Sequence, residues 1–127
     1  MSESGHEYLK THQISGDAVL IDVDAEAQAV LDSARGEATG RAARTLVKEG
    51  PLRVVLLGLK QGASLREHDA DGPVSLHVLK GRVEIAVPQH QETLSEGRAL
   101  VFASSVAHSV LALSDAVVLI TIAHPAA

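Results

Sequence analysis

Hydrophobic residues from Arg44 onward either alternate with polar ones or form short apolar runs, and turns that contain glycine separate these runs. Short runs separated by turns about every eight to twelve residues predict an antiparallel sandwich or barrel. The strands that we expect cover residues 43–48, 52–60, 74–80, 82–87, 98–103, 108–114 and 116–123. Most of the chain is therefore predicted to be all-β.

One segment before these strands has the period of an amphipathic helix. Within Asp24–Gly36 the hydrophobic residues that share a face are Ala27, Val30, Leu31 and Ala34. Asp24 is a suitable N-cap, because its carboxylate can accept a hydrogen bond from an amide of the first turn, and Gly36 is a typical stop. The preceding Ala18–Asp22 is expected to form a short strand.

Two of the expected strands, Val54–Leu59 and Ala116–Ala123, are apolar on both faces. Strands of this kind are usually covered on both sides. One side can face the interior of a barrel, and the helix can cover part of the other. Because the helix offers few strong apolar positions, we expect a homodimer in which a second copy of the chain covers the remainder.

Length and composition fit one domain, with an N-terminal arm and helix at residues 1–43 and a barrel at residues 44–124. Hydrophobic residues make up 46% of the 127, yet the chain has one Tyr and one Phe, so Val, Leu, Ile and Ala must form the core. The absence of Cys excludes disulfides, thiolate zinc sites, Fe–S clusters and Cys nucleophiles, and it weakly favours a reducing compartment.

Charge and hydropathy exclude several classes of partner. The net charge is −5 and the Lys and Arg residues are scattered, which argues against a nucleic-acid partner. No run of about 18 apolar residues is present, so no membrane span is predicted, and residues 1–17 lack the apolar core of a signal peptide. We therefore expect a cytoplasmic protein without nucleic-acid or membrane partners.

The glycines and histidines of the strand region are similar to the two motifs of the cupins, a family of jelly-roll barrels. The first motif is G-x5-H-x-H-x3-E-x6-G, and Gly62, His68 and Gly81 match it. The second is G-x5-P-x-G-x2-H-x3-N, and Gly97 and His108 match it. The chain thus resembles the small single-domain bacterial cupins. This resemblance implies an RmlC-like, antiparallel, double-stranded jelly-roll β-barrel, here with one N-terminal helix.

Departures from these motifs affect the metal site of the family. Cupin metals are held by three histidines and a glutamate, and the second histidine and the glutamate fall here on Ala70 and Val74. The second motif's proline, glycine and asparagine are replaced by Ala103, Ser105 and Ala112. The resemblance implies that the remaining His68 and His108 enter the barrel mouth. Two histidines alone make a weak site for Zn, Ni, Mn, Fe or Cu, with water in the other positions.

Two roles stay open for His68 and His108. They can form a residual metal site or a general acid/base pair, because histidine titrates near neutral pH. Alternatively, they are partly buried histidines that hydrogen-bond to each other, to water or to the backbone. His77 alternates with Leu76 and Val78 along one strand, so it is expected to point away from the interior.

The same alternation predicts a mainly aliphatic pocket with two imidazoles at one end. Its expected ligand-binding residues are His68, His108, Val74, Leu76, Val78, Ile85 and Val101. Val83 is also expected to line it, and Ala70 and Ala112 stand where metal-binding relatives have polar groups. An apolar wall with a few fixed polar groups is typical of small-molecule sites. The same residues are equally compatible with a packed core.

We therefore expect a cupin that binds a small molecule and holds a divalent metal weakly. The alternative is a metal-dependent cupin enzyme of the dioxygenase or isomerase type, in which water, Asp69 or Asp71 completes a reduced two-histidine site. A third hypothesis is a structural or sensory protein whose dimer surface is the functional part. The sequence identifies neither a catalytic residue nor the ligand, because cupin folds host many unrelated functions.

Overall fold

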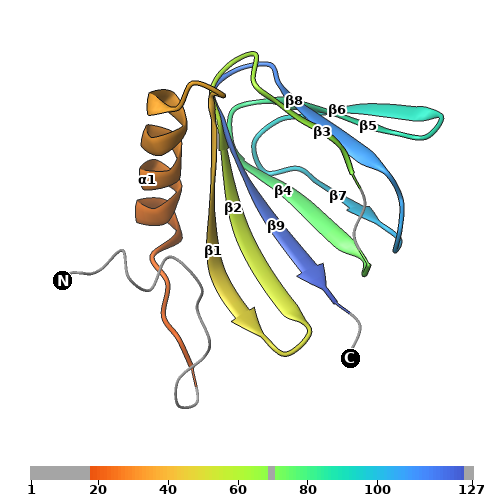
Figure 1. Ribbon diagram of the computed structural model, residues 1–127, viewed down its shortest axis with the longest axis horizontal. Coiled ribbons are helices and arrows are strands. Elements are labelled where there is room, and N and C mark those ends of the chain that lie inside the picture. The colour runs from red at the N-terminus through yellow and green to blue at the C-terminus, as the bar shows by residue number, and fades with distance from the viewer. Residues whose placement is uncertain (1–17, 69–70, 125–127) are drawn as a thin grey trace.

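The computed structural model describes residues 18–68 and 71–124, with the side chains of Glu67 and His68 outside the description. Figure 1 shows one helix followed by strands. The elements are α1 (Val23–Gly36), β1 (Arg41–Glu49), β2 (Leu52–Leu59), β3 (Ser64–His68), β4 (Val74–Lys80), β5 (Val83–Val87), β6 (His90–Leu94), β7 (Ala99–Phe102), β8 (His108–Ala112) and β9 (Ala116–Ala123). Every strand expected from Arg44 onward is present, and β3 and β6 are additional.

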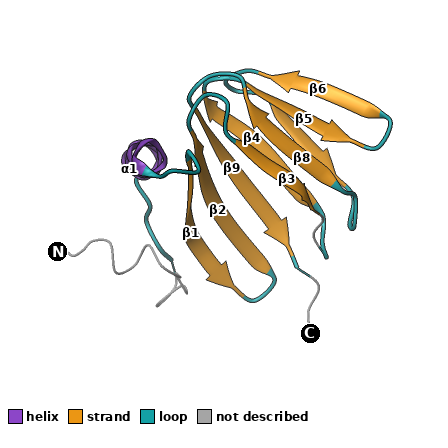
Figure 2. Cartoon of the chain, turned by 45° about the horizontal axis from the view of Figure 1, so that its top comes forward, coloured by secondary structure: helices purple, strands orange, loops and turns teal. Residues whose placement is uncertain are grey.

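The strands form two antiparallel sheets, with the orders β1-β2-β9-β4-β7 and β3-β8-β5-β6. The sheets face each other across a hydrophobic core (Figure 2). Within the described part of the chain no strand pair joins the two sheets, so they do not close into a continuous ring. The expected all-β jelly roll with one helix near the N-terminus is confirmed.

The central core is aliphatic, as the composition predicts. Both sheets contribute to it through the inward positions of their middle strands. Its fully buried members include Leu59, Val78, Val83, Ile85, Ala116 and Val118. The aromatic ring of Phe102 is also buried in this core. Residues of β4 alternate between the core and the outer face of the sheet: Leu76 and Val78 are buried, and His77 is partly exposed.

The start of α1 differs from the expectation. Ala18–Asp22 is not a strand, and the helix begins at Val23. Asp22 is the N-cap: its backbone is extended and its carboxylate accepts a hydrogen bond from the amide of Ala25 at 3.1 Å. The prediction that Asp24 caps the helix is wrong, because Asp24 lies inside the first turn. An acidic residue there still interacts favourably with the positive end of the helix dipole.

Helix α1 packs against the outer face of the five-stranded sheet, over β1, β2 and β9. Its buried apolar face is the predicted one, formed by Ala27, Val30, Leu31 and Ala34. The approach is close at Gly58, where an added Cβ would lie 2.6 Å from the carbonyl oxygen of Val30. Glycine is therefore needed at this position. The expectation that the helix covers part of the outer face of the doubly apolar strands is confirmed.

The first strand starts earlier than expected. β1 begins at Arg41, so the expected division between an arm at residues 1–43 and a barrel at residues 44–124 falls inside it. Arg44 in this strand forms an ion pair with the buried Glu26 of α1, with 3.7 Å between guanidinium nitrogen and carboxylate oxygen. Among the described residues, no helix has the length and apolar character to cross a membrane.

Candidate functional site

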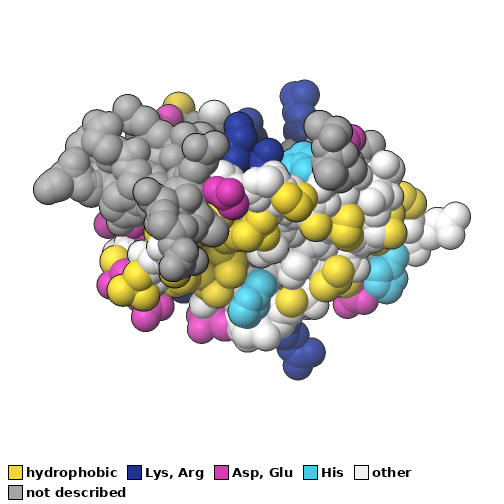
Figure 3. Space-filling model, turned by 90° about the horizontal axis from the view of Figure 1, so that it is seen from below, with side chains coloured by type: hydrophobic (Ala, Val, Ile, Leu, Met, Phe, Trp, Pro, Cys, Tyr) yellow, Lys and Arg dark blue, Asp and Glu magenta, His cyan; other side chains and the backbone are white. Residues whose placement is uncertain are grey.

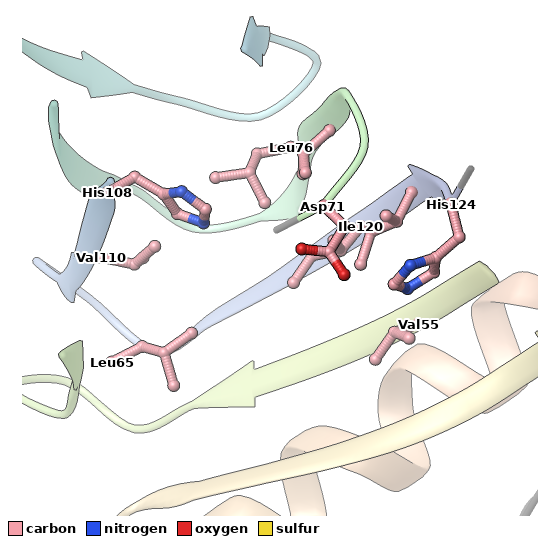
Figure 4. A pocket seen from close by; sticks show the side chains of 10 residues that line it. Val55, Leu65, Asp71, Leu76, His108, Val110, Ile120 and His124 are labelled. Carbon is pink, nitrogen blue, oxygen red and sulfur yellow. The ribbon is translucent and has the colours of Figure 1, made fainter. Parts of the chain in front are cut away.

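A pocket of about 350 Å³ lies between the two sheets. Its wall is mostly aliphatic, and three polar side chains interrupt it (Figure 4). The residues that line it are Val55, Leu65, Asp71, Val74, Leu76, His108, Val110, Ile120, Ile122 and His124. Cavities of this size, with an apolar wall and few polar groups, are typical of small-molecule sites. The expected aliphatic pocket is therefore present, with a lining that partly differs from the expected one.

His108 is the buried polar group of the pocket. It opens β8, its side chain is only 3% exposed, and its ring projects into the pocket in Figure 4. One face of the imidazole lies against Phe102, with 4.6 Å between ring centroids. Its Nδ1 is 3.1 Å from the carbonyl oxygen of Val106. Because a carbonyl can only accept, this contact favours the tautomer with its proton on Nδ1 and a lone pair on Nε2.

His68 lies opposite His108 in the backbone register of β3 and β8. Its side chain lies outside the description, as do Asp69 and Ala70. A shift in register between Leu65 and His68 marks a bulge at this end of β3. The backbone therefore brings together the two strands that carry the histidines matched to the cupin motifs.

The described residues do not supply a complete cupin metal site. Val74 occupies the glutamate position of the motif, is buried, lines the pocket and has no lone pair to donate. Among the described residues, no group of three or more His, Cys, Asp and Glu side chains is placed to hold a metal ion. The described polar side chains of the pocket, which are His108, Asp71 and His124, therefore do not make up a metal site of three or more ligands by themselves.

Four of the expected pocket residues divide into two groups. Val74 and Leu76 line the pocket. Val78 and Ile85 are fully buried in the core and do not line it. The prediction that Val78 and Ile85 bind a ligand is therefore wrong. Both point inward as predicted, but neighbouring side chains cover them completely. Val83, which was also expected to line the pocket, and Ala112 are likewise packed in the core.

The expected position of Val101 in the pocket is wrong. Val101 is 69% exposed. In the register of β4 and β7 it lies opposite Ser75, whereas the inward Leu76 lies opposite Leu100. Opposed residues in an antiparallel pair share a face. Val101 therefore lies on the outer face of the sheet. The strand that contains it is apolar at successive positions, so alternation alone does not identify its inward side.

Asp71 and His124 line the pocket together, although the sequence alone does not predict that they meet. Asp71 precedes β4, and His124 follows β9. Figure 4 shows their side chains on the side of the pocket away from His108, pointing toward one another. His124 continues the alternation of Ile120 and Ile122, a signal that could have placed it. Asp71 lies in a turn, where alternation does not apply.

The backbone fixes Asp71 and His124 in place. The amide of Ala123 donates to the carbonyl of Pro73 at 3.2 Å, and the amide of His124 donates to the carbonyl of Pro51 at 2.7 Å. Gly72 is buried between these segments, and an added Cβ there would lie 1.7 Å from the carbonyl oxygen of Ala123. The loop before β4 and the end of β9 are thus packed together without room for a side chain.

These segments lie at the lower end of the molecule in Figure 1, where β4 begins and β9 ends. Figure 3 looks at the molecule from that end, and hydrophobic side chains run across the middle of the view with histidines among them. In the part of this view that is not grey, hydrophobic side chains gather across the middle, and Lys and Arg side chains lie toward its upper and lower edges.

Comparisons with known proteins identify the architecture. No family model matches the chain. No curated protein matches it either. Among solved structures, a conserved protein of unknown function from Streptococcus pyogenes is 22% identical, with a TM-score of 0.66 over 90% of this chain and 93% of that one.

Two further structures carry descriptive names. An RmlC-like cupin from Shewanella frigidimarina NCIMB 400 is 17% identical, with a TM-score of 0.65 over 69% of this chain and 79% of that one. A salicylate 1,2-dioxygenase from Pseudaminobacter salicylatoxidans is 18% identical, with a TM-score of 0.69 over 78% of this chain and 33% of that one. At these identities the likeness concerns the fold. The two facing sheets, the cupin motifs and these neighbours agree, and the chain has the RmlC-like jelly-roll fold of the cupins.

Proposed function

We propose that this protein binds a small molecule in the pocket between its two sheets. The observation that carries the proposal is His108, a buried imidazole in a mainly aliphatic cavity of about 350 Å³. A polar group of this kind is costly to bury unless it is hydrogen-bonded. The Val106 carbonyl lies 3.1 Å from Nδ1, and the ring projects into the cavity, so His108 is a fixed polar group in an otherwise aliphatic wall.

We further propose that a divalent transition metal such as Zn, Ni, Mn, Fe or Cu binds weakly beside this pocket, with His68 and His108 as its two protein ligands. The backbone pairing of these residues supports the proposal. Val74 limits the affinity, because it places an aliphatic side chain where a glutamate would complete the site. Water would occupy the remaining coordination positions.

A second candidate function is a metal-dependent enzyme of the dioxygenase or isomerase type. The position of Asp71 supports this candidate function, because the Asp71 carboxylate lines the same pocket as His108. Oxygen donors of this kind can serve as metal ligands beside imidazoles. This candidate requires a metal that is tightly bound to the purified protein, whereas the first one requires only weak binding.

Thermal shift measurements test the proposed function. Zn, Ni, Mn, Fe and Cu, and separately a set of small organic acids, amines and aromatics, are added to the wild type, His68→Ala, His108→Ala and His90→Ala. A ligand present at 100 times its Kd stabilises by about 2.7 kcal/mol. This corresponds to a rise of several degrees in Tm. His90 is exposed on β6 and is the matched control.

We expect millimolar metal to raise the Tm of the wild type and of His90→Ala but not of His68→Ala or His108→Ala. We also expect at least one organic compound to raise the Tm of the wild type. One tightly held metal per purified chain, found by elemental analysis, would overturn the weak site in favour of the enzyme. No response to any metal or organic compound would overturn the proposed function.

We also propose that the protein is a homodimer, in which a second copy covers the outer face of β4 and β7. α1 covers the neighbouring strands β1, β2 and β9. The outer positions where β4 and β7 pair are Ser75, His77, Ala99 and Val101, and none of them is Lys, Arg, Asp or Glu. Lys80, at the end of β4, donates to Gln28 of α1. Charged residues are depleted at the centres of protein interfaces, so this composition supports self-association.

A further inference from the structure

The Asp71 carboxylate gives the pocket a hydrogen-bond acceptor, because a carboxylate only accepts when it is ionised. Nδ1 of His108 lies 3.1 Å from the Val106 carbonyl. A neutral His124 adds one donor and one acceptor. Among the described lining residues there is no Lys or Arg. The lining therefore complements a ligand that brings its own donors and a positive charge.

Arg53 is a described cation on the inward face of the same sheet, opposite Ile122 in the register of β2 and β9. Its guanidinium donates to the carbonyl of Gly50 at 2.7 Å and to that of Leu52 at 3.0 Å. Arg53 is therefore directed to the turn between β1 and β2 and does not line the pocket. It does not provide the cation that an anionic ligand would need there.

Asp71 is well placed to meet such a ligand at the mouth of the pocket. Asp71 is exposed. In Figure 4 its carboxylate lies beside Ile120, between His124 and the interior of the pocket. The packing of Gly72 against Ala123 holds the backbone beside it. The backbone that carries the acceptor is thus held in place before a ligand arrives, which reduces the entropy lost on binding.

We propose that the pocket selects small aliphatic amines. The ammonium group binds to the Asp71 carboxylate at the mouth, and the hydrocarbon chain extends along Leu76 and Ile120 toward His108. This inference rests on the proposed function of the pocket as a small-molecule site. A charge-assisted hydrogen bond binds the amine, whereas Asp71 repels the carboxylate of an acid of the same length.

The aliphatic wall predicts how affinity depends on chain length. Burial of one CH₂ group is worth about 0.8 kcal/mol, which is about a fourfold change in Kd. The Kd of n-butylamine and n-hexylamine should therefore fall by about this factor per carbon until the chain fills the pocket. A ligand bound only by surface electrostatics would show no such dependence.

Calorimetric titration of n-hexylamine, hexanoic acid and 1-hexanol at pH 8 tests the proposal. An alkylamine resembles the Lys side chain, which titrates near about 10.4, and a carboxylic acid titrates near about 4.3, so the first is cationic and the second anionic. We expect hexylamine to bind at least tenfold more tightly than hexanoate. Its affinity should decrease as salt is added, because ions screen exposed charges.

The decisive variant is Asp71→Asn, which removes the charge while keeping the size. It should weaken hexylamine binding about fivefold or more and leave 1-hexanol unchanged. Asp32→Asn is the matched control, because Asp32 is an exposed acidic residue on α1, and it should bind as the wild type does. Methyl NMR signals of Val110 and Ile120 should shift on titration, which locates the ligand in the pocket.

The possible failures are distinguishable. If hexanoate or hexanol binds as tightly as hexylamine, or if the preference for amine survives in Asp71→Asn, the amine inference is overturned while the pocket remains a small-molecule site. If none of the three compounds binds, the amine inference is overturned, and the wider set of compounds in the thermal shift measurements then decides the proposed function.

Discussion

At the scale of single residues, Val74 limits the chemistry of the pocket. It is buried, it lines the cavity, and it stands where the cupin motif has a glutamate. Valine packs well against the aliphatic wall but supplies no lone pair. A carboxylate at this position would add a third donor to the two histidines proposed to hold a metal. Valine in place of the motif's glutamate is therefore the physical reason for the weak metal affinity proposed above.

Replacing Val74 with Glu is expected to strengthen the metal site. Without metal the variant should lose about 2 to 4 kcal/mol of unfolding free energy, because a carboxyl group replaces a buried methyl pair. Added Zn or Ni should then raise its Tm more than that of the wild type, since metal binds only the folded state. Val74→Gln is the control of matched size. An equal metal response in the Glu and Gln variants would contradict the prediction.

The sequence predicted part of the pocket residue by residue. His108, Val74 and Leu76 were found because they lie in motifs or in a strand with clear alternation. Asp71 lies in the turn before β4, where no period indicates the direction of a side chain, whereas His124 continues the alternation of Ile120 and Ile122 past the end of β9. Contacts between segments distant in sequence bring them to the pocket. Such contacts leave no local pattern in the sequence.

At the scale of elements, alternation predicted strands wherever several apolar residues recur. β3 (SLREH) and β6 (HQETL) were missed because each has a single apolar residue, Leu65 or Leu94. Their pairing with β8 and β5 supplies the order that their own sequences do not. The helix was predicted well because four apolar positions fix its buried face. Its N-cap was misplaced because Asp22 and Asp24 are both capable of capping.

Asp115 connects three elements and gives a prediction about pH. Its carboxylate accepts from the amide of Gln61 at 2.8 Å and pairs with Arg35 of α1 at 2.9 Å. The hydrogen bond from Gln61, followed by Arg35, lowers the pKa of Asp115 below its ordinary 3.8. As the pH falls, the unfolded chain binds this proton first. The stabilisation is therefore complete above about pH 4 and is lost as the pH falls through the folded-state pKa.

Asp115→Asn should lower the free energy of unfolding by about 1 kcal/mol at neutral pH, because the site is partly exposed and water screens the ion pair. Urea unfolding as a function of pH measures this. The difference from the wild type should shrink below about pH 4. Asp32→Asn weakens a longer contact of 3.5 Å to the same Arg35 and keeps an oxygen that can accept from Gln28, so it should have a smaller effect. A constant difference down to pH 2 would contradict the role of the charge.

At the scale of the whole molecule, the two faces of the five-stranded sheet have different roles. The inner face builds the core and one wall of the pocket, and α1 covers the outer face over β1, β2 and β9. This asymmetry follows from the sequence of β2 and β9, which are apolar on both faces. Where β4 and β7 pair, the outer face beyond the helix has no charged residue, and its Val101 is 69% exposed. This surface is the one proposed to contact a second copy.

The homodimer predicts that Val101→Arg dissociates the protein. Light scattering with size-exclusion chromatography should give twice the chain mass of 13.3 kDa for the wild type and the single mass for the variant. A symmetric interface would contain this arginine twice, once from each subunit, and each guanidinium would be buried without a partner. The cost of burying these charges should raise the dimer Kd about a hundredfold or more. Leu111→Arg is the matched control, because Leu111 is a partly exposed aliphatic residue of the other sheet. A monomeric wild type, or dissociation by Leu111→Arg alone, would exclude this face as the interface.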